Sequence, residues 1–140
     1  MACTPRPTSP VTGFGLLGHL LEMTKASGVD VRLQLASIPV LDGARETAAA
    51  GVLSSLQPAN VRLRRAIRDL DAAQRLPLYP LLFDPQTAGG LLAGVPAANA
   101  GACIVALRAE GTLKPPSSAK CCRLQTRRSR WCTVQKVGAN

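Results

Sequence analysis

Apolar residues recur at helical spacing near the start of the chain and then alternate with polar ones. From Phe14 onward they fall at positions i, i+3 and i+7, which predicts a helix over Phe14–Ser27 that Gly28 ends. The alternation along Val29–Leu35 predicts a half-buried strand. The chain is therefore expected to form a helix followed directly by a strand.

The rest of the pattern also mixes helices with strands. Prolines and glycines divide it into short pieces, so no element is expected to be long. We expect an α+β fold with a mixed sheet and flanking helices. The further predicted elements are helices over Ala44–Ala50, Ala59–Leu70 and Ala97–Ala109, a short buried strand that starts at Leu81 and runs into a loop ending at Gly90, and a strand over Leu91–Val95.

Three stretches of the chain differ in composition and in hydrophobic pattern. Residues 1–10 hold prolines without a hydrophobic period and are expected to be an irregular leader. Residues 11–111 carry the predicted elements and are expected to form one domain. Residues 112–140 lack acidic side chains and have little periodic apolar content, so we expect disorder there, or at best a frayed strand near Trp131–Val137.

The net charge of +9 is concentrated at one end of the chain. Residues 1–111 carry 10 basic and 8 acidic side chains, whereas residues 112–140 carry 7 basic ones and no acid. The charge thus describes the tail and gives weak support to a nucleic-acid-binding domain. The composition also excludes collagen-like, coiled-coil and disulfide-scaffold classes, because glycine shows no period, no heptad is sustained and cysteine is sparse.

The five cysteines are too scattered for a structural zinc site. No two of them form a C-x-x-C pair, and His19 is the only histidine. An odd number of cysteines without a recognisable signal peptide favours reduced thiols and a cytoplasmic location. Glycine, proline and polar residues interrupt the uncharged stretch from Pro85 to Leu107, so we expect no membrane span and no membrane partner.

Two short segments have the residue types of binding loops. Val11–His19 reads V-T-G-F-G-L-L-G-H and places a Thr-Gly turn before a helix, where a hydroxyl can cap the helix and backbone N–H groups can meet an anion. An ordinary helix cap is the simpler explanation of this turn. Phe83–Leu92 reads F-D-P-Q-T-A-G-G-L-L, and its Asp-Pro, Gln-Thr and Gly-Gly pairs favour a loop of defined shape over a regular element.

Two polar side chains in these segments have a structural explanation beside a functional one. His19 lies on an apolar helix and is expected to pack or hydrogen-bond in the core. Asp84 is expected to hold its own turn by accepting backbone N–H bonds near Gln86 and Thr87, rather than to bind a metal.

Other conspicuous residues also favour ordinary structural roles. Cys103 is expected to be a small buried side chain of the last helix, together with Ile104 and Leu107. The arginines in Arg62–Arg68 are expected to face solvent, with contact to nucleotide phosphates as the alternative.

Together the two segments resemble the C-terminal domain of selenophosphate synthetase, also called selenide, water dikinase, in the aminoimidazole ribonucleotide synthetase superfamily. The resemblance rests on Val11–His19 and Phe83–Leu92 and covers roughly Val11–Gly111. Several ordered motifs are more specific than a single glycine pattern. The segments between the two motifs that also resemble the family, in the same order, are Ile38–Ala44, Ser54–Asn60 and Leu78–Leu82.

The resemblance implies a three-layered α+β domain that closes over the ATP cleft of an enzyme. The family uses ATP, Mg²⁺ and selenide to make selenophosphate, releasing AMP and phosphate. Its N-terminal domain dimerises and carries the nucleophile, the essential lysine and most metal ligands. This chain is therefore expected to hold no catalytic residue and to need that domain, or a homodimer partner. The residues expected to form a lid over the ATP cleft are Thr12, Gly13, Phe14, Gly15, Asp84, Gln86 and Thr87.

The chain departs from the family pattern at three places. It shows no counterpart of the N-terminal domain, so we expect a truncated domain or fragment. Pro10 stands where the family has a magnesium-binding aspartate in an ungapped match; in the alternative match, Ala2–Thr4 corresponds to the residues before that aspartate and Pro5–Pro10 replaces it. Either way no metal site is expected, because a proline side chain offers no oxygen ligand. A basic tail stands where the family has a closing strand.

Three functional hypotheses follow. The leading one is the C-terminal part of an ATP-dependent selenophosphate synthetase that is inactive alone. The alternative is a non-catalytic binding module whose tail contacts nucleic acid weakly and non-specifically, through residues such as Arg127, Arg128, Arg130 and Trp131. The third is a chain without activity that does not fold stably alone.

Overall fold

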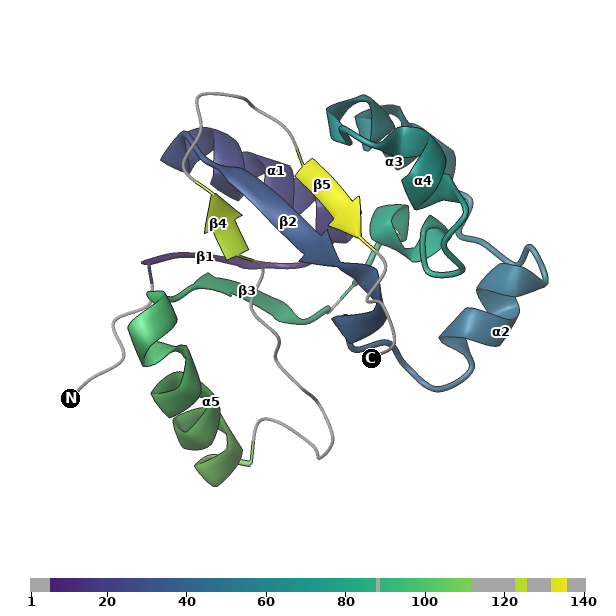
Figure 1. Cartoon of the computed structure of the whole chain (residues 1–140). Coiled ribbons are helices and arrows are strands. Elements are labelled where there is room, and N and C mark those ends of the chain that lie inside the picture. The colour runs from purple at the N-terminus through teal and green to yellow at the C-terminus, as the bar shows by residue number, and fades with distance from the viewer. Residues whose placement is uncertain (1–5, 88, 112–122, 126–131, 136–140) are drawn as a thin grey trace.

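A computed structural model describes residues 6–87, 89–111, 123–125 and 132–135 of the chain (Figure 1). Helices cover a three-stranded sheet in the order β4–β2–β5, and a two-stranded ribbon, β1–β3, runs beside it. Strand β2 (Asp30–Gln34) is antiparallel to β4 (Arg123–Gln125) and parallel to β5 (Cys132–Gln135), so this sheet is mixed. The predicted α+β class with a mixed sheet and flanking helices is confirmed.

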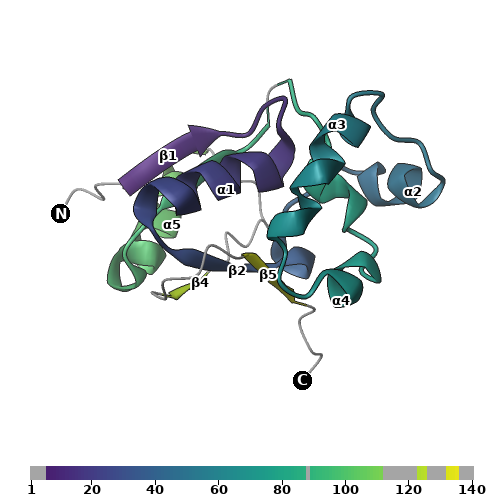
Figure 2. The same ribbon diagram turned by 90° about the horizontal axis from the view of Figure 1, so that it is seen from above.

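Helix α1 (Gly15–Ser27) and strand β2 form the centre of the molecule, as the apolar pattern predicts. The helix ends at Gly28, whose φ of 63° lets its N–H turn back to the carbonyls of Thr24 and Lys25. Seen from above, α1 lies over the sheet that contains β2 (Figure 2). Its inward residues pack on those of β2, because both elements present one apolar face.

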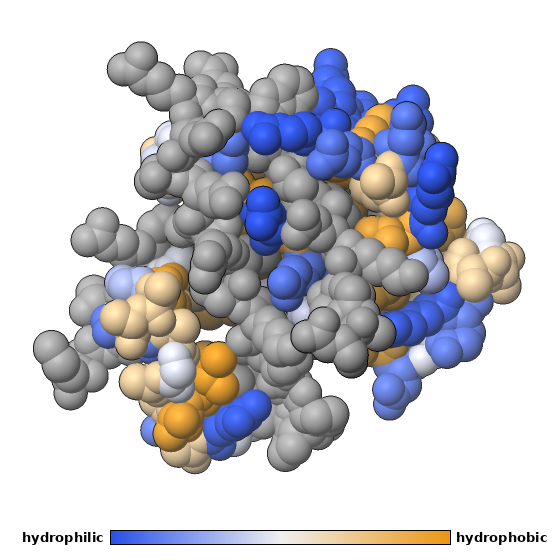
Figure 3. All heavy atoms as spheres, in the orientation of Figure 1, coloured by the Kyte–Doolittle hydropathy of each residue, from blue (hydrophilic) through white to orange (hydrophobic). Residues whose placement is uncertain are grey.

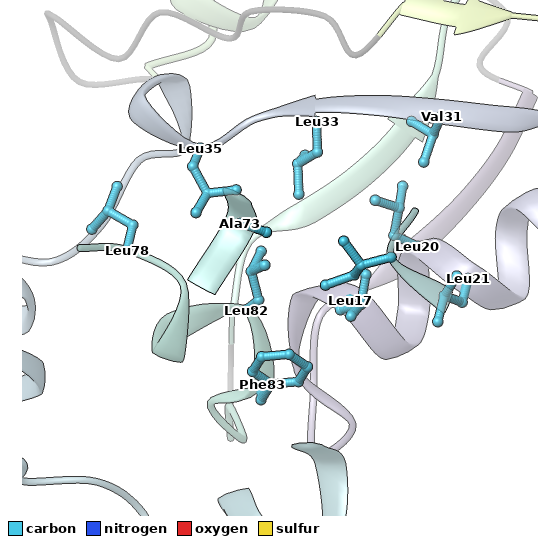
Figure 4. Close-up of a cluster of buried hydrophobic side chains, with 11 residues drawn as sticks. Leu17, Leu20, Leu21, Val31, Leu33, Leu35, Ala73, Leu78, Leu82 and Phe83 are labelled. Carbon is cyan, nitrogen blue, oxygen red and sulfur yellow. The ribbon is translucent and has the colours of Figure 1, made fainter. Parts of the chain in front are cut away.

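The core lies between α1, β2 and the turns that follow residue 66. Leu17 is fully buried, and Leu82 and Phe83 are each only 1% exposed. Figure 4 shows the labelled core side chains pointing toward one another from α1, β2 and the later turns. Each fully buried large apolar side chain contributes about 1.5–3 kcal/mol relative to exposure. The core is made of Leu17, Leu20, Leu21, Val31, Leu33, Leu35, Ile67, Ala73, Leu78, Leu82 and Phe83.

The prediction of an irregular leader over residues 1–10 is wrong for its second half. Residues Arg6–Pro10 form strand β1, which pairs antiparallel with β3 (Leu91–Gly94). The register shifts between Arg6 and Thr8, around a proline that has no N–H to donate. Pairing with a distant strand supplies the order that the local pattern lacks. The division into a domain over residues 11–111 and flanking segments stays a prediction.

The tail also differs from the prediction of disorder over residues 112–140. Its residues 123–125 and 132–135 form β4 and β5, on either side of β2. The second of these strands falls within the stretch Trp131–Val137, where a strand was the alternative. The edges of β2 offer unpaired backbone groups, and pairing with them orders these two short pieces. The rest of the predicted disorder lies outside the described residues.

The single helix predicted over Ala59–Leu70 is wrong, because the chain breaks into three turns. These are α3 (Gln57–Val61), the 3-10 helix η2 (Arg62–Ala66) and α4 (Leu70–Gln74). The break falls at Ile67, which is extended, with φ −92° and ψ 122°, and only 4% exposed. Burial of Ile67 in the core overrides the local helical preference.

The short buried strand predicted from Leu81 is also wrong. Residues Pro80–Phe83 form the 3-10 helix η3, with i to i+3 bonds from Leu82 N–H to Tyr79 O and from Asp84 N–H to Leu81 O. Successive residues of a strand point to opposite faces, whereas this tight turn buries Leu82 and Phe83 together. The edge-to-face contact of Tyr79 with Phe83, at 5.1 Å between ring centroids, supports the turn.

The remaining helices agree more closely with the pattern. Helix α2 (Ala44–Ala49) follows the 3-10 turn η1 (Leu35–Ser37), and α5 (Ala100–Ala109) follows η4 (Ala97–Asn99). The inward face predicted for α5 is not buried: Cys103 and Ile104 are half-buried, and Leu107 is exposed. In Figure 3 apolar side chains accordingly gather on the surface over α5, at the lower left.

Candidate functional site

The two segments singled out in the sequence lie side by side. The N–H of Gln86 donates to the carbonyl of Thr12 at 3.1 Å, and the N–H of Gly89 donates to the carbonyl of Val11 at 3.1 Å. The N–H of Val11 donates in turn to Gly90 O at 2.9 Å. We call Thr12–Gly15 and Asp84–Thr87 the paired turns. They come together because β1 and β3 are neighbours and each turn adjoins one of these strands.

Gly15 sets the close approach of the two turns. Its φ is +69°, and an added Cβ would lie 2.9 Å from the carbonyl carbon of Phe83 and 3.0 Å from the carbonyl oxygen of Leu82. Both the backbone conformation and the space therefore favour glycine. The start of α1 is thus seated directly on the backbone of η3.

Two buried amide side chains join α3 to this region, and the sequence pattern predicted no role for either. Asn60 is 7% exposed, and its Nδ2 donates to Gly13 O at 2.9 Å and to Phe83 O at 3.1 Å. Gln57 donates from Nε2 to Pro80 O at 2.8 Å. A signal existed for Asn60, which precedes Leu63 and Ile67 at helical spacing and so interrupts an apolar stripe.

His19 holds the first of the paired turns from inside the helix. The side chain is buried and bonded, as predicted: Thr12 N–H donates to Nε2 at 3.1 Å, and Ser9 Oγ lies 3.1 Å from Nδ1. The Thr12 hydroxyl also lies 3.0 Å from Nε2. Thr12 therefore does not cap α1 with its side chain, in contrast to the expectation, because the histidine competes for its hydroxyl.

Phe14 and the backbone beside it face solvent. The Phe14 side chain is 57% exposed, and its ring contacts the His19 ring at 5.9 Å between centroids. Within the described part of the chain, the N–H groups of Gly13 and Phe14 have no hydrogen-bond acceptor. These groups stand at the start of α1, where the helix dipole favours negative charge. The first turn can therefore receive an anionic group of a ligand.

The second of the paired turns is held by its own side chains. Gln86 Nε2 donates to Asp84 Oδ2 at 2.7 Å. Asp84 was expected to accept backbone N–H bonds near Gln86 and Thr87 instead, but the Gln86 N–H is taken by Thr12. The carboxylate accordingly bonds the Gln86 amide, and Thr87 is exposed.

The arginine-rich turn η2 lies close to α1 but does not enter the paired turns. Arg62, Arg64 and Arg65 are exposed, as predicted. Arg68 forms an ion pair with Asp30 at 3.4 Å, and its side chain is 48% exposed. A hollow of about 380 Å³ is lined by Arg68–Ala72, and no residue of the paired turns lines it. The hydrophilic surface over α3 and α4 is visible at the upper right of Figure 3.

The side-chain oxygen atoms at the paired turns do not form a set of ligands suited to magnesium. Asp84 offers one carboxylate that already bonds Gln86, and Pro10 has no side-chain oxygen. In the part of the chain that the structure describes, no three His, Cys, Asp or Glu side chains gather closely enough to hold a metal ion. None of the described helices combines the length and apolar character needed to cross a membrane.

Comparison with known proteins identifies relatives of this chain. Residues 10–115 match the family described as AIR synthase related protein, C-terminal domain. The chain is 41% identical over 110 residues to the selenide, water dikinase of Pelobacter propionicus, covering 79% of this chain and 30% of that protein. It is 38% identical over 85 residues to the enzyme of that name from Clostridioides difficile, covering 61% of this chain and 24% of that protein.

A third relative has the same name and similar coverage. The selenide, water dikinase of Trichlorobacter lovleyi is 42% identical over 93 residues, which cover 64% of this chain and 25% of that protein. The chain thus spans between about a quarter and a third of the length of these curated relatives. Its resemblance to selenophosphate synthetase is confirmed, and the chain belongs to the family of AIR synthase related proteins, of which it carries the C-terminal domain.

Proposed function

We propose that this chain supplies the C-terminal, nucleotide-covering part of a selenide, water dikinase. The reaction converts selenide, ATP and water into selenophosphate, AMP and phosphate. The observation that supports this role is the contact between Thr12–Gly15 and Asp84–Thr87, since two segments that begin 72 positions apart form one surface at the start of α1. The relatives are named selenide, water dikinases, and the phosphoryl donor that we propose for this surface is ATP.

Each of the paired turns has a separate part in this proposal. The exposed N–H groups of Gly13 and Phe14 would meet phosphate oxygens, helped by the α1 dipole, which contributes about 0.3–1 kcal/mol per charge at such sites. Gly15 permits the close seating on η3. Asp84, Gln86 and Thr87 would complete the lid. Phosphoryl transfer by this family also needs Mg²⁺, whose ligands we expect outside this chain, because the described residues do not fit it.

The exposed apolar side chains favour a partner. Helix α5 and strand β3 expose Val105 (67%) and Leu91 (69%), and apolar side chains gathered on one surface, as over α5 in Figure 3, often mark a contact surface. We propose that the N-terminal catalytic domain, or a second subunit, covers part of this surface and supplies the nucleophile, the lysine and the metal ligands. A cytoplasmic location is part of this proposal, because an odd number of cysteines favours reduced thiols. The exposed apolar residues between η1 and α3 are Leu41, Val52, Leu53 and Leu56.

The decisive experiment is an assay of AMP formation from ATP and selenide. The 140-residue chain alone is expected to give no turnover above background. Mixed with the complementary N-terminal part of the Pelobacter propionicus relative, it is expected to give selenide-dependent AMP. Turnover by the chain alone would refute the proposed division of labour. If the mixture stays inactive although the two parts co-purify, the nucleotide-covering role is wrong.

Two other readings stay predictions. Arg127, Arg128, Arg130 and Trp131, which motivate weak nucleic-acid binding, lie outside the described residues. A filter-binding titration against salt, with and without residues 112–140, tests that alternative. The hypothesis that the isolated chain does not fold stably is tested by a thermal melt followed by circular dichroism: it predicts no cooperative transition, whereas the nucleotide-covering role requires one.

A further inference from the structure

His19 is a buried imidazole whose two nitrogens contact different parts of the chain. The residue is 8% exposed, so each ring nitrogen needs a partner within the protein. Nε2 faces Thr12 on the first of the paired turns, and Nδ1 faces Ser9 on β1. The ring therefore connects the end of β1 to the start of α1 across the turn between them.

The partners determine which nitrogen carries the proton. The Thr12 backbone N–H can only donate, and it lies 3.1 Å from Nε2, so Nε2 must offer its lone pair. A neutral ring then carries its proton on Nδ1, which donates to Ser9 Oγ at 3.1 Å. Ser9 Oγ can accept this proton because its own hydroxyl proton is donated to Pro10 O at 3.3 Å. Every donor in this chain of bonds has an acceptor.

We propose that His19, as the neutral Nδ1–H tautomer, is a positioning residue that fixes the Thr12–Gly15 turn. One ring sets the direction of the Thr12 backbone N–H, orients its hydroxyl, and supports the Phe14 ring at 5.9 Å. Since Nε2 has no proton, the ring donates nothing to the Thr12 hydroxyl, whose lone pairs stay available to other donors. It would then accept from a ligand hydroxyl or a bound water.

This inference rests on the proposed function only for the identity of the ligand. The tautomer and the restraint on the turn concern the chain alone. A histidine that merely fills space would show neither a fixed tautomer nor a dependence on which of its two nitrogens is imitated. Those two properties therefore separate positioning from packing.

The first test is nitrogen NMR of the ¹⁵N-labelled 140-residue chain. His19 is the only histidine, so its ring gives the only imidazole signals and no assignment variant is needed. At about pH 8, Nδ1 is expected to show the shift of a protonated nitrogen and Nε2 that of an acceptor. The opposite pattern, or two averaged shifts, would overturn the proposal.

The second test compares His19→Gln with His19→Asn. The glutamine amide oxygen reaches the position of Nε2 and can accept from Thr12 N–H, whereas the asparagine amide reaches only the position of Nδ1. Hydrogen exchange at the Thr12 amide is expected to stay close to wild type in the first variant and to be about five- to tenfold faster in the second. Equal exchange in both would overturn the proposal, and the tautomer measurement decides it if neither variant folds.

The third test uses the complex with the complementary N-terminal part. A positioning role predicts that His19→Asn raises the KM for ATP about tenfold and that His19→Gln largely restores it. Loss of folded protein would instead lower kcat at an unchanged KM, and that result would refute positioning of the ligand. If the wild-type complex is inactive, the proposed function fails, while the tautomer and exchange results still decide the role of His19.

Discussion

A Cβ atom on Gly15 would lie 2.9 Å from the carbonyl carbon of Phe83, so the start of α1 and the end of η3 meet backbone to backbone. This contact joins two segments that are 68 residues apart in the chain. Because Gly15 also has a φ of +69°, conformation and space act in the same direction. The paired turns thus depend on one residue that has no side chain.

Gly15→Ala is expected to destabilise the chain by about 2–4 kcal/mol, from left-handed strain of about 1–2 kcal/mol together with the clash. Gly28→Ala is the matched control, because Gly28 has a φ of +63° but nothing within 4 Å of its Cβ position. It carries the strain alone and is expected to cost about 1–2 kcal/mol. Urea denaturation of both variants measures the difference. Equal losses would show that the contact with η3 is unimportant.

Asn60 offers a second test of the contact. Asn60→Asp keeps the size of the side chain but replaces the donor to Gly13 O and Phe83 O with an acceptor. It is expected to cost more than Asn60→Ala, which itself costs about 1–3 kcal/mol, because a carboxylate would face two carbonyl oxygens. Denaturation curves give the order of stability. If Asn60→Asp proves the more stable variant, the two bonds do not hold the turns.

Gln57→Glu is the control for this prediction. Gln57 donates to Pro80 O, so the same chemical change acts on η3 but leaves the bond to Gly13 in place. The variant is expected to lose stability without a change in the amide shifts of Gly13 and Phe14. Asn60→Asp is expected to move both signals.

The sequence was sufficient for elements whose apolar pattern is local. Helix α1 and strand β2 each show one periodicity and are found within two residues of their predicted bounds. Strand β1 could not be found this way, because its order comes from pairing with β3. Likewise Ile67 is extended and buried in the core instead of helical, because it packs against residues that are distant in the sequence and that a local pattern does not reveal.

For the candidate site too, one part could be predicted from the sequence and another could not. The motifs predicted which turns matter, and the structure brings Thr12 and Gln86 together. What joins them was not predictable, since the partners of Asn60 lie 47 and 23 residues away. A polar residue on an apolar stripe is visible in a sequence, but the carbonyls that it bonds are visible only in the fold.

Gly18 lies one helical turn after Phe14, and its lack of a side chain leaves room for Phe14. A Cβ there would lie 2.6 Å from Phe14 Cβ and 3.4 Å from Leu63 Cδ1. Alanine is preferred to glycine inside a helix by about 1 kcal/mol, but the clash involves an atom fixed to the backbone and is expected to win. Gly18→Ala should therefore destabilise the chain and shift the Phe14 amide. A gain in stability would mean that the backbone at Phe14 shifts without cost to make room for the new Cβ.

A double variant tests whether the Phe14 contact is the cause. Phe14→Gly removes the Cβ that Gly18→Ala would strike, so the second change should cost less in the Phe14→Gly background than in the wild type. The coupling measured by a double-mutant cycle is expected to be about 1 kcal/mol or more. Additive losses would place the clash elsewhere, for example at Leu63.

The second of the paired turns is tested by its side-chain bond. Gln86→Glu replaces the amide that donates to Asp84 Oδ2 at 2.7 Å and brings two carboxylates together. At low salt the variant is expected to lose about 1–2 kcal/mol, part of which returns in about 1 M salt, where the Debye length is only about 3 Å. Adding Asp84→Asn restores a donor facing an acceptor in the reverse sense. Denaturation at two salt concentrations should then show recovery in the double variant, whereas a further loss would indicate that the Asp84 carboxylate itself holds the loop.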